Sequence, residues 1–195
     1  MVFRYGDRAE YVLNRCSVQV RRNDRVLLEG PSGCGKSTLV SLLSGLRQPE
    51  SGLVLLGGLD RRTVGTDEWR RRVATAPQFH ENHVLTETFA FNALMGRGWP
   101  PSEMDMIQTE AVCRELGLGD LLDRMPSGLL QIVGDSGWQL SHGEKSRLYI
   151  ARTLLQGAEV VILDESLGAL DPESMRKALR CLTLRAPTLV VVTHR

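Results

Sequence analysis

The chain has 195 residues, of which 42% are hydrophobic, so it can bury a sizeable core and is not an intrinsically disordered protein. Its 24 lysines and arginines nearly balance 23 aspartates and glutamates, so no overall charge draws it to nucleic acid or to an anionic membrane. Four scattered cysteines without metal-ligand spacing argue against a secreted disulfide framework and indicate a reducing, intracellular setting. The apolar runs are much shorter than the roughly 20 residues that a membrane-spanning helix needs.

The N-terminal part is predicted to place strands and a helix around a glycine-rich turn. Residues 17–20 alternate polar and apolar side chains and predict a strand, and the apolar run 26–28 predicts a second one. Residues 36–46 carry leucines at helical spacing before the proline and glycine of RQPESG. Residues 52–60 predict one short strand, and residues 67–78 predict a short charged helix leading into an apolar segment.

The composition of the sequence changes between about residues 79 and 137, where glycines, prolines and helical patterns predict a mostly helical insertion. A helix beginning at Ser141 follows, and then two apolar runs, 160–165 and 188–193, on either side of a helical pattern. The apolar runs lack alternation, as strands do when both faces of a parallel sheet are buried. Because the chain stops just after the last of these predicted strands, we expect it to be part of a longer protein.

The segment GPSGCGKST lies between a predicted strand and a predicted helix and fits the phosphate-loop pattern G-x-x-x-x-G-K-S/T. Its glycines let the backbone wrap round a polyphosphate with N–H groups pointing inward. Lys36 adds a cation near the β- and γ-phosphates, and the Ser37 hydroxyl can bind Mg²⁺. An ordinary glycine-rich turn is the alternative, but the pattern in this context favours nucleotide binding. The predicted contacts are Gly30, Pro31, Ser32, Gly33, Cys34, Gly35, Lys36, Ser37 and Thr38.

Two further segments carry candidate chemistry. The apolar run VVILDE ends in two carboxylates, and charge at the end of a buried strand requires a partner or a metal. Asp164 could hold Mg²⁺ through water, and Glu165 is placed to polarise an attacking water, although a strand end with solvated acids is the simpler alternative. The segment LSHGE gives Ser141 and Glu144 the spacing of a helix capping box, which by itself indicates only a well-started helix.

In their order along the chain, these segments resemble the ATP-binding cassette (ABC) ATPases, which are the nucleotide-binding domains of ABC transporters. The resemblance rests on GPSGCGKST, Gln78, LSHGEKSRLYIARTLL, VVILDE, GALD and VVVTHR, and it covers essentially the whole chain. It implies an α/β P-loop NTPase fold with a mainly parallel core sheet, a small antiparallel β subdomain and a helical subdomain. In a single domain, residues 1–78 and 138–195 would form the RecA-like core with the β subdomain, and residues 79–137 the helical subdomain.

The resemblance also implies catalytic roles. Gln78 resembles the Q-loop glutamine, Glu165 the general base and His194 the switch histidine that contacts the γ-phosphate. Tyr5 is similar to the aromatic residue that stacks on adenine. The implied ligands are ATP and Mg²⁺, and the metal would be held by Ser37, Gln78 and Asp164.

The family works as a head-to-tail dimer, in which ATP lies between the phosphate loop of one subunit and the signature segment of the other. Ser141, Gly143 and Glu144 match the signature. Asp171 in GALD resembles the D-loop aspartate, although an aspartate before a proline is also typical of a helix N-cap. His142 stands where the signature commonly has glycine, and we expect it to be tolerated there because a Cβ costs little in a helical conformation.

The implied partners are a second nucleotide-binding domain, in a homo- or heterodimer, and a transmembrane domain. They would place the chain at the cytoplasmic face of the cell membrane, as a peripheral subunit or as a domain of a membrane protein, with no nucleic acid bound. The run VGDSGWQLSHGE and the ending THR are similar to exporter-type domains. Two alternatives stay open. One is a soluble ABC-type ATPase of DNA repair or translation, which usually has long coiled-coil insertions or two cassettes. The other is a binding-only cassette with weak hydrolysis, against which Glu165 and His194 argue.

Overall fold

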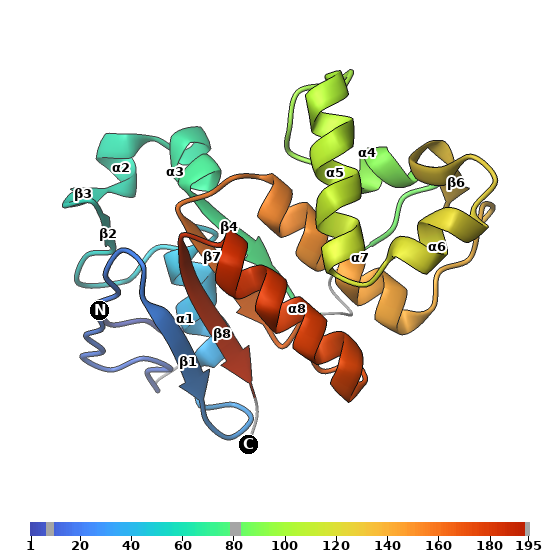
Figure 1. Ribbon diagram of the computed structural model, residues 1–195. Coiled ribbons are helices and arrows are strands. Elements are labelled where there is room, and N and C mark those ends of the chain that lie inside the picture. Colours follow the sequence, from blue (N-terminus) through green and yellow to red (C-terminus); the bar gives the residue numbers. More distant parts are fainter. Residues whose placement is uncertain (7–9, 79–82, 194–195) are drawn as a thin grey trace.

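The computed structural model describes residues 1–6, 10–78 and 83–193, so the predicted switch residue His194 lies outside the described residues. At its centre is a parallel four-stranded sheet with the strand order β1-β8-β7-β4 (Figure 1). The parallel sheet confirms the predicted fold class. Its strands are β1 (Arg25–Glu29), β4 (Val73–Ala76), β7 (Val160–Asp164) and β8 (Thr188–Thr193).

Three helices cover the two faces of this sheet, namely α1 (Lys36–Leu43), α7 (His142–Leu155) and α8 (Pro172–Arg185). Val161 and Leu163 of β7 belong to the core cluster that β7 forms with α7 and α8. Ile162 lies between them in the sequence and belongs to a second cluster, with Val40 of α1. Because alternate residues of a strand point to opposite faces, α1 covers one face of the sheet and α7 and α8 cover the other. This double cover explains why the strand has no polar residue before its carboxyl end.

A small hairpin lies between α1 and the sheet strand β4, where the sequence predicted one strand over residues 52–60. It consists of β2 (Leu55–Leu56) and β3 (Leu59–Asp60), which pair antiparallel. Gly57 and Gly58 join them with φ angles of 60° and 82°, as a two-residue hairpin turn of the primed type requires. The prediction of a single strand was therefore wrong. The hairpin leads into α2 (Arg61–Val64) and α3 (Thr66–Arg72).

Two other expectations for the N-terminal part are also corrected. Residues 17–20 form no strand, and Val18 is exposed. Alternation is not sufficient for a strand, because a strand also needs a backbone neighbour for its hydrogen bonds, and no described segment forms a ladder with these residues. Leu46, counted in the predicted helix, lies beyond the end of α1 and is exposed.

The region predicted as a helical insertion contains α4 (Phe89–Ala93), α5 (Glu103–Glu115), α6 (Gly119–Arg124) and a short 3-10 helix (Gly128–Leu130). It also contains a two-residue antiparallel ladder that the sequence analysis missed, formed by β5 (Glu87–Thr88) and β6 (Ile132–Val133). These elements gather on the side of α7 away from α1 (Figure 1). Phe89, Leu116 and Val133 join the core cluster of α7, so the insertion packs directly on that helix. Among the helices in the described ranges, none is both long enough and apolar enough for a membrane span.

Candidate functional site

The carboxyl ends of three parallel strands bring the predicted site residues to one edge of the sheet. In the strand register, Glu29 at the end of β1 lies opposite Thr193 of β8, and Asp164 at the end of β7 lies opposite Val192 of the same strand. The phosphate loop follows β1 directly, and Glu165 follows β7. In open α/β sheets this edge is where ligands bind, and the topology places the loop and both carboxylates along it.

The loop after β1 is shaped by its glycines. Gly33 and Gly35 have φ angles of 79° and 94°, in the left-handed region that favours glycine. A Cβ built on Gly30 would approach the Cys34 Sγ atom to 2.8 Å, and one on Gly35 would lie 3.2 Å from the Val12 carbonyl oxygen. No side chain caps the start of α1, and its first turn holds no acidic residue. A helix start of this kind is an anion site, so the geometry suits a phosphate group.

Lys36 is folded back into this loop. Its Nζ atom donates to the carbonyl oxygens of Gly30 at 2.7 Å and Pro31 at 2.9 Å, and only 6% of the residue is exposed. The ammonium is therefore held inside the loop by the chain itself. Backbone carbonyls hold the cation in the loop, and phosphate oxygens would offer it stronger, charge-assisted hydrogen bonds.

Two side chains from other elements contact the first turn of α1. The Gln78 Nε2 atom donates to the Ser37 Oγ atom at 3.2 Å, which joins the end of β4 to the loop. The Tyr5 hydroxyl lies 3.0 Å from the Thr38 Oγ1 atom. The guanidinium of Arg47 lies over the Tyr5 ring, 4.7 Å from its centroid. The predicted adenine-stacking residue thus lies beside the loop, with Arg47 against its ring.

Two acidic residues lie at the carboxyl end of β7, with Asp164 as its last residue and Glu165 directly after it. Asp164 is 5% exposed at the end of the strand. Glu165 has a φ of 54°, which is uncommon for a residue other than glycine, and its N–H donates to the Val192 carbonyl oxygen at 3.1 Å. Outliers of this kind often occur at functional sites, where the surrounding structure holds them.

Ser166 connects these carboxylates to β4, and the sequence analysis did not single it out. Its buried hydroxyl donates to the carbonyl oxygens of Ala76, at 2.9 Å, and Pro77, at 3.2 Å. The end of β7 is thereby tied to the residues just before Gln78. A serine after two acids has no distinctive pattern in the sequence, because its partners are 89 and 90 positions away.

The predicted metal ligands have the chemistry that Mg²⁺ prefers. Ser37 offers a hydroxyl oxygen, Gln78 an amide oxygen and Asp164 a carboxylate, all hard oxygen donors. Ser37 and Gln78 are already in contact, and Asp164 lies at the same sheet edge. The residues present therefore fit a magnesium ion that also binds phosphate.

The start of α7 shows the predicted capping box. Ser141 accepts a hydrogen bond from the Glu144 N–H at 3.2 Å, and the Glu144 carboxylate accepts from the Ser141 N–H at 2.7 Å. Arg124 of α6 donates to the same carboxylate at 2.9 Å. His142 is the exposed first residue of the helix, and a Cβ on Gly143 would meet only the Ala169 carbonyl oxygen, at 3.7 Å.

Asp171 is the N-cap of α8, with Pro172 as the first residue of the helix. Its carboxylate accepts from the N–H groups of Ser174, at 3.0 Å, and Glu173, at 2.9 Å. Hydrogen bonds from Ser174 first, and then from Glu173, lower the pKa of the Asp171 carboxyl to about 2. The N-cap interpretation is confirmed, and it leaves the proposed D-loop role in place.

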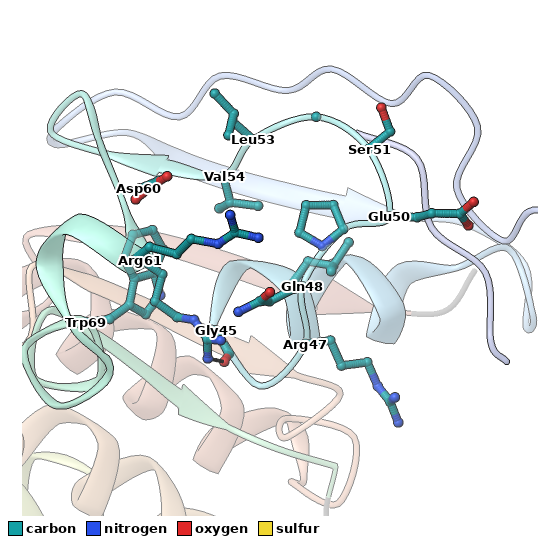
Figure 2. A pocket seen from close by; sticks show the side chains of 14 residues that line it. Gly45, Arg47, Gln48, Glu50, Ser51, Leu53, Val54, Asp60, Arg61 and Trp69 are labelled. Atoms are coloured by element: carbon teal, nitrogen blue, oxygen red, sulfur yellow. Dashed lines mark hydrogen bonds between the residues drawn. The ribbon is translucent and has the colours of Figure 1, made fainter.

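A separate surface pocket of about 220 Å³ lies between the segment 45–54, which follows α1, and the residues of α2 and α3 (Figure 2). Figure 2 shows Arg61 and Trp69 on one side of it and Glu50 on the other. Trp69 donates from its Nε1 atom to the Leu43 carbonyl oxygen at 3.0 Å, and Arg61 donates to that of Gly45. The 14 lining residues include none of the predicted nucleotide contacts, so the pocket is distinct from the phosphate loop.

The parallel sheet, the phosphate loop and the acidic strand end together define a P-loop nucleotide-binding domain. The family model described as ABC transporter matches residues 13–168. The chain therefore belongs to the ABC transporter family, as its nucleotide-binding domain.

Relatives and a solved structure agree with this assignment. The chain is 40% identical over 195 residues to the mycobactin import ATP-binding/permease protein IrtB of Mycolicibacterium thermoresistibile, covering 99% of this chain and 32% of the relative. It is 34% identical over 197 residues to the ATP-dependent lipid A-core flippase of Ralstonia nicotianae, covering 100% and 33%. A bacterial Atm1-family ABC exporter with ATP bound superposes with a TM-score of 0.87 at 32% identity, over 100% of this chain and 33% of that one. The chain spans about a third of the length of each of these proteins.

Proposed function

We propose that the chain hydrolyses ATP and thereby drives transport by a longer membrane protein. The observation that carries the proposal is the sheet edge where the phosphate loop, with Lys36 inside it, meets the strand end at Asp164 and Glu165. A purely structural role does not explain why a buried lysine and an acidic residue with a positive φ lie at the same edge of the sheet. The transporter names of the relatives favour this function over a soluble ATPase of DNA repair or translation.

In the proposed mechanism, different residues of the chain bind the nucleotide, hold the metal ion and activate the attacking water. The loop 30–38 binds the phosphates through its backbone N–H groups and Lys36, and Tyr5 stacks on adenine. Ser37, Gln78 and Asp164 would hold Mg²⁺, which supplies charge neutralisation on the phosphate oxygens. The Glu165 carboxylate accepts the proton of the attacking water, and His194 contacts the γ-phosphate.

The proposed active unit is a head-to-tail dimer of two such domains. Ser141, Gly143 and Glu144 at the start of α7 would face the nucleotide bound to the partner copy, because a helix N-terminus favours an anion. Asp171 would lie in the D-loop at the same interface. We further propose that the dimer works with a transmembrane domain at the cytoplasmic face of the membrane. We also propose the division into a core of residues 1–78 and 138–195 and a helical subdomain of residues 79–137.

The cargo is outside the proposal. The relatives are named for mycobactin import, lipid A-core flipping and multidrug transport. Since proteins with such different names share this domain, we infer that the domain is the motor and that the rest of each relative selects what is moved.

The test is the variant Glu165→Gln, which keeps the shape of the side chain and removes the base. We expect ATP binding to be retained and hydrolysis to fall on the order of 100-fold or more, as for loss of a general base. Glu110→Gln on the exposed surface of α5 is the matched control, and its hydrolysis should be unchanged. Hydrolysis at the parental rate by Glu165→Gln would contradict the proposed mechanism.

A further inference from the structure

We propose that Arg47 is a positioning residue for nucleotide binding, which holds the Tyr5 ring from the face opposite the one that adenine contacts. The inference rests on the proposed function, because it takes Tyr5 as the residue that stacks on the base. It adds a residue of the segment after α1, outside the phosphate loop, to the set on which ATP affinity depends.

The Tyr5 hydroxyl attaches one end of the ring to α1. It lies 3.0 Å from the Thr38 Oγ1 atom, and Thr38 is 6% exposed in the first turn of that helix. The phosphate loop leads directly into the same turn. The contact therefore fixes the ring beside the loop that is proposed to hold the phosphates.

The buried side chain of Phe3 supports the same ring from the protein interior. The two rings meet edge to face, with their centroids 5.0 Å apart and an interplanar angle of 88°. Phe3 is 7% exposed and belongs to a core cluster with Leu39 and Leu42 of α1. Tyr5 packs against this cluster, so the ring is joined to α1 both directly and through the core.

Arg47 covers one face of the Tyr5 ring. Its guanidinium carbon lies over the ring, 4.7 Å from the centroid, within the range of a cation–π contact. Arg47 also lies at the margin of the surface pocket, but Figure 2 shows its side chain directed away from Arg61 and Trp69. A planar guanidinium stacks on an aromatic face, and an aromatic ring has two faces. With Arg47 on one of them, adenine takes the other.

The segment that carries Arg47 is itself tied to the residues around Tyr5. The Arg4 guanidinium donates twice to the Glu50 carboxylate, at 2.9 and 3.0 Å. The Glu50 N–H donates to the Val2 carbonyl oxygen at 2.9 Å. Since Arg47 precedes Glu50 by only three residues, these contacts hold its backbone close to the ring that its side chain covers.

The contacts lower the entropic cost of binding a base. A ring that is able to change rotamer loses this freedom when a base stacks on it, and the loss opposes binding. Arg47 and the hydroxyl contact restrict the Tyr5 ring through the chain itself, so less freedom remains to be lost. Arg47 thus raises the affinity for ATP through the ring and without a contact to the phosphates.

Titration calorimetry of the full chain with two probes tests the inference. The probes are ATP, which carries the base, and inorganic tripolyphosphate, which does not. We expect Arg47→Met to weaken ATP binding about 3-fold, as for loss of an exposed cation–π contact, and to leave tripolyphosphate binding unchanged.

A double-mutant cycle shows whether Arg47 acts through the ring. Tyr5→Leu should weaken ATP binding on the order of 10-fold, as for loss of one stacked base, and should not affect tripolyphosphate. Adding Arg47→Met to Tyr5→Leu should cause little further loss, because no ring is left to position.

Controls separate positioning from charge and from folding. Arg180→Met, on the exposed face of α8, should change neither affinity. Tyr11 is 45% exposed with the Arg4 guanidinium 5.3 Å from its ring centroid, and Tyr11→Leu should leave ATP binding unchanged although it removes a similar pair. Arg47→Lys keeps the cation and loses the planar group, so it should recover part of the affinity. Thermal unfolding checks each variant, and if Tyr5→Leu does not fold, the two probes on Arg47→Met decide alone.

Three results would overturn the inference. Equal losses of ATP and tripolyphosphate binding in Arg47→Met would mean that the arginine acts on the phosphates. Unchanged or tighter ATP binding would mean that the guanidinium contributes nothing or occupies the adenine face. Losses that multiply in the double variant would mean that Arg47 acts independently of Tyr5. In all three cases the Glu165→Gln comparison still decides the proposed function by itself.

Discussion

The helices α1 and α7 both begin at a proposed phosphate contact, but their first turns are built in opposite ways. The start of α1 follows Gly35, which has a left-handed backbone and no capping side chain, and its first turn has no acid. The start of α7 is closed by the reciprocal hydrogen bonds of Ser141 and Glu144, and Arg124 binds the same glutamate. An uncapped helix start leaves N–H groups for a ligand, whereas a capping box satisfies two of them internally.

The difference assigns separate tasks to the two helices. The start of α1 needs a ligand to complete it, so it is suited to bind the nucleotide within one chain. The start of α7 has a capping box that fixes its shape, so it is suited to present that shape to the partner's nucleotide in the proposed dimer. Binding should therefore depend chiefly on α1, and turnover on α1 and α7 together.

The largest effect is expected at α1. Lys36→Ala removes the cation inside the phosphate loop and leaves the carbonyl groups of Gly30 and Pro31 without their donor. Loss of a charge-assisted hydrogen bond to phosphate should weaken ATP binding on the order of 100-fold. Titration calorimetry with ATP measures this, and circular dichroism checks that the fold is retained. Tight ATP binding by the folded variant would show that the start of α1 is not the nucleotide site.

The next largest effect is expected at the capping box of α7, which can be compared with the chemically similar capping box of α5. Ser141→Ala opens the box of α7, and Ser102→Ala opens the one that Ser102 and Asp105 form at α5. Both changes should cost about 1 kcal/mol in the free energy of unfolding, as loss of an N-cap does. Only Ser141→Ala should also reduce ATP turnover. Equal turnover losses in the two variants would show that α7 has no special role.

The start of α8 extends the comparison to a third helix, because its contribution to the free energy of unfolding should depend on pH. Asp171 caps α8 as an ionised carboxylate, with a folded-state pKa of about 2 against an ordinary value of 3.8. Because the folded-state pKa is the lower one, the stabilisation is fully present above pH 4 and is lost as the pH falls towards 2. Asp171→Asn keeps a capping side chain but does not titrate. Urea unfolding should find the parent more stable than the variant at pH 5 and this advantage gone at pH 2; a constant difference would contradict the assignment.

The smallest effect is expected at His142. The residue is exposed at the first position of α7 and has a helical neighbourhood, so His142→Gly should leave ATP turnover within a few-fold of the parent. Steady-state hydrolysis measures the difference. A large loss would mean that the imidazole contributes directly to the reaction, and the capping box would then explain only part of what α7 does.

Features that depend on residues close together in the sequence could be predicted, whereas features that depend on partners distant in the sequence could not. The phosphate loop, the capping box and the apolar run of β7 are local patterns, and each was found where the sequence placed it. The hairpin at Gly57 and Gly58 was also local, and a two-glycine turn between short apolar runs could have identified it.

The errors and omissions involve distant partners. The strand predicted at residues 17–20 does not form, because alternation does not supply a neighbour. Asn92 and Arg152 are 60 positions apart, and each looks like an ordinary helix residue in the sequence. Only the packing of α4 against α7 brings the Arg152 guanidinium to the Asn92 carbonyl oxygen.

The central claim, that two copies enclose ATP between α1 of one and α7 of the other, is tested most directly by the mass of the Glu165→Gln variant in solution. Analytical ultracentrifugation should show a monomer without nucleotide and a dimer with ATP, since the variant binds ATP and cannot consume it. A Glu165→Gln chain that binds ATP and stays monomeric at all protein concentrations, or a monomer that still hydrolyses ATP normally, would contradict the account.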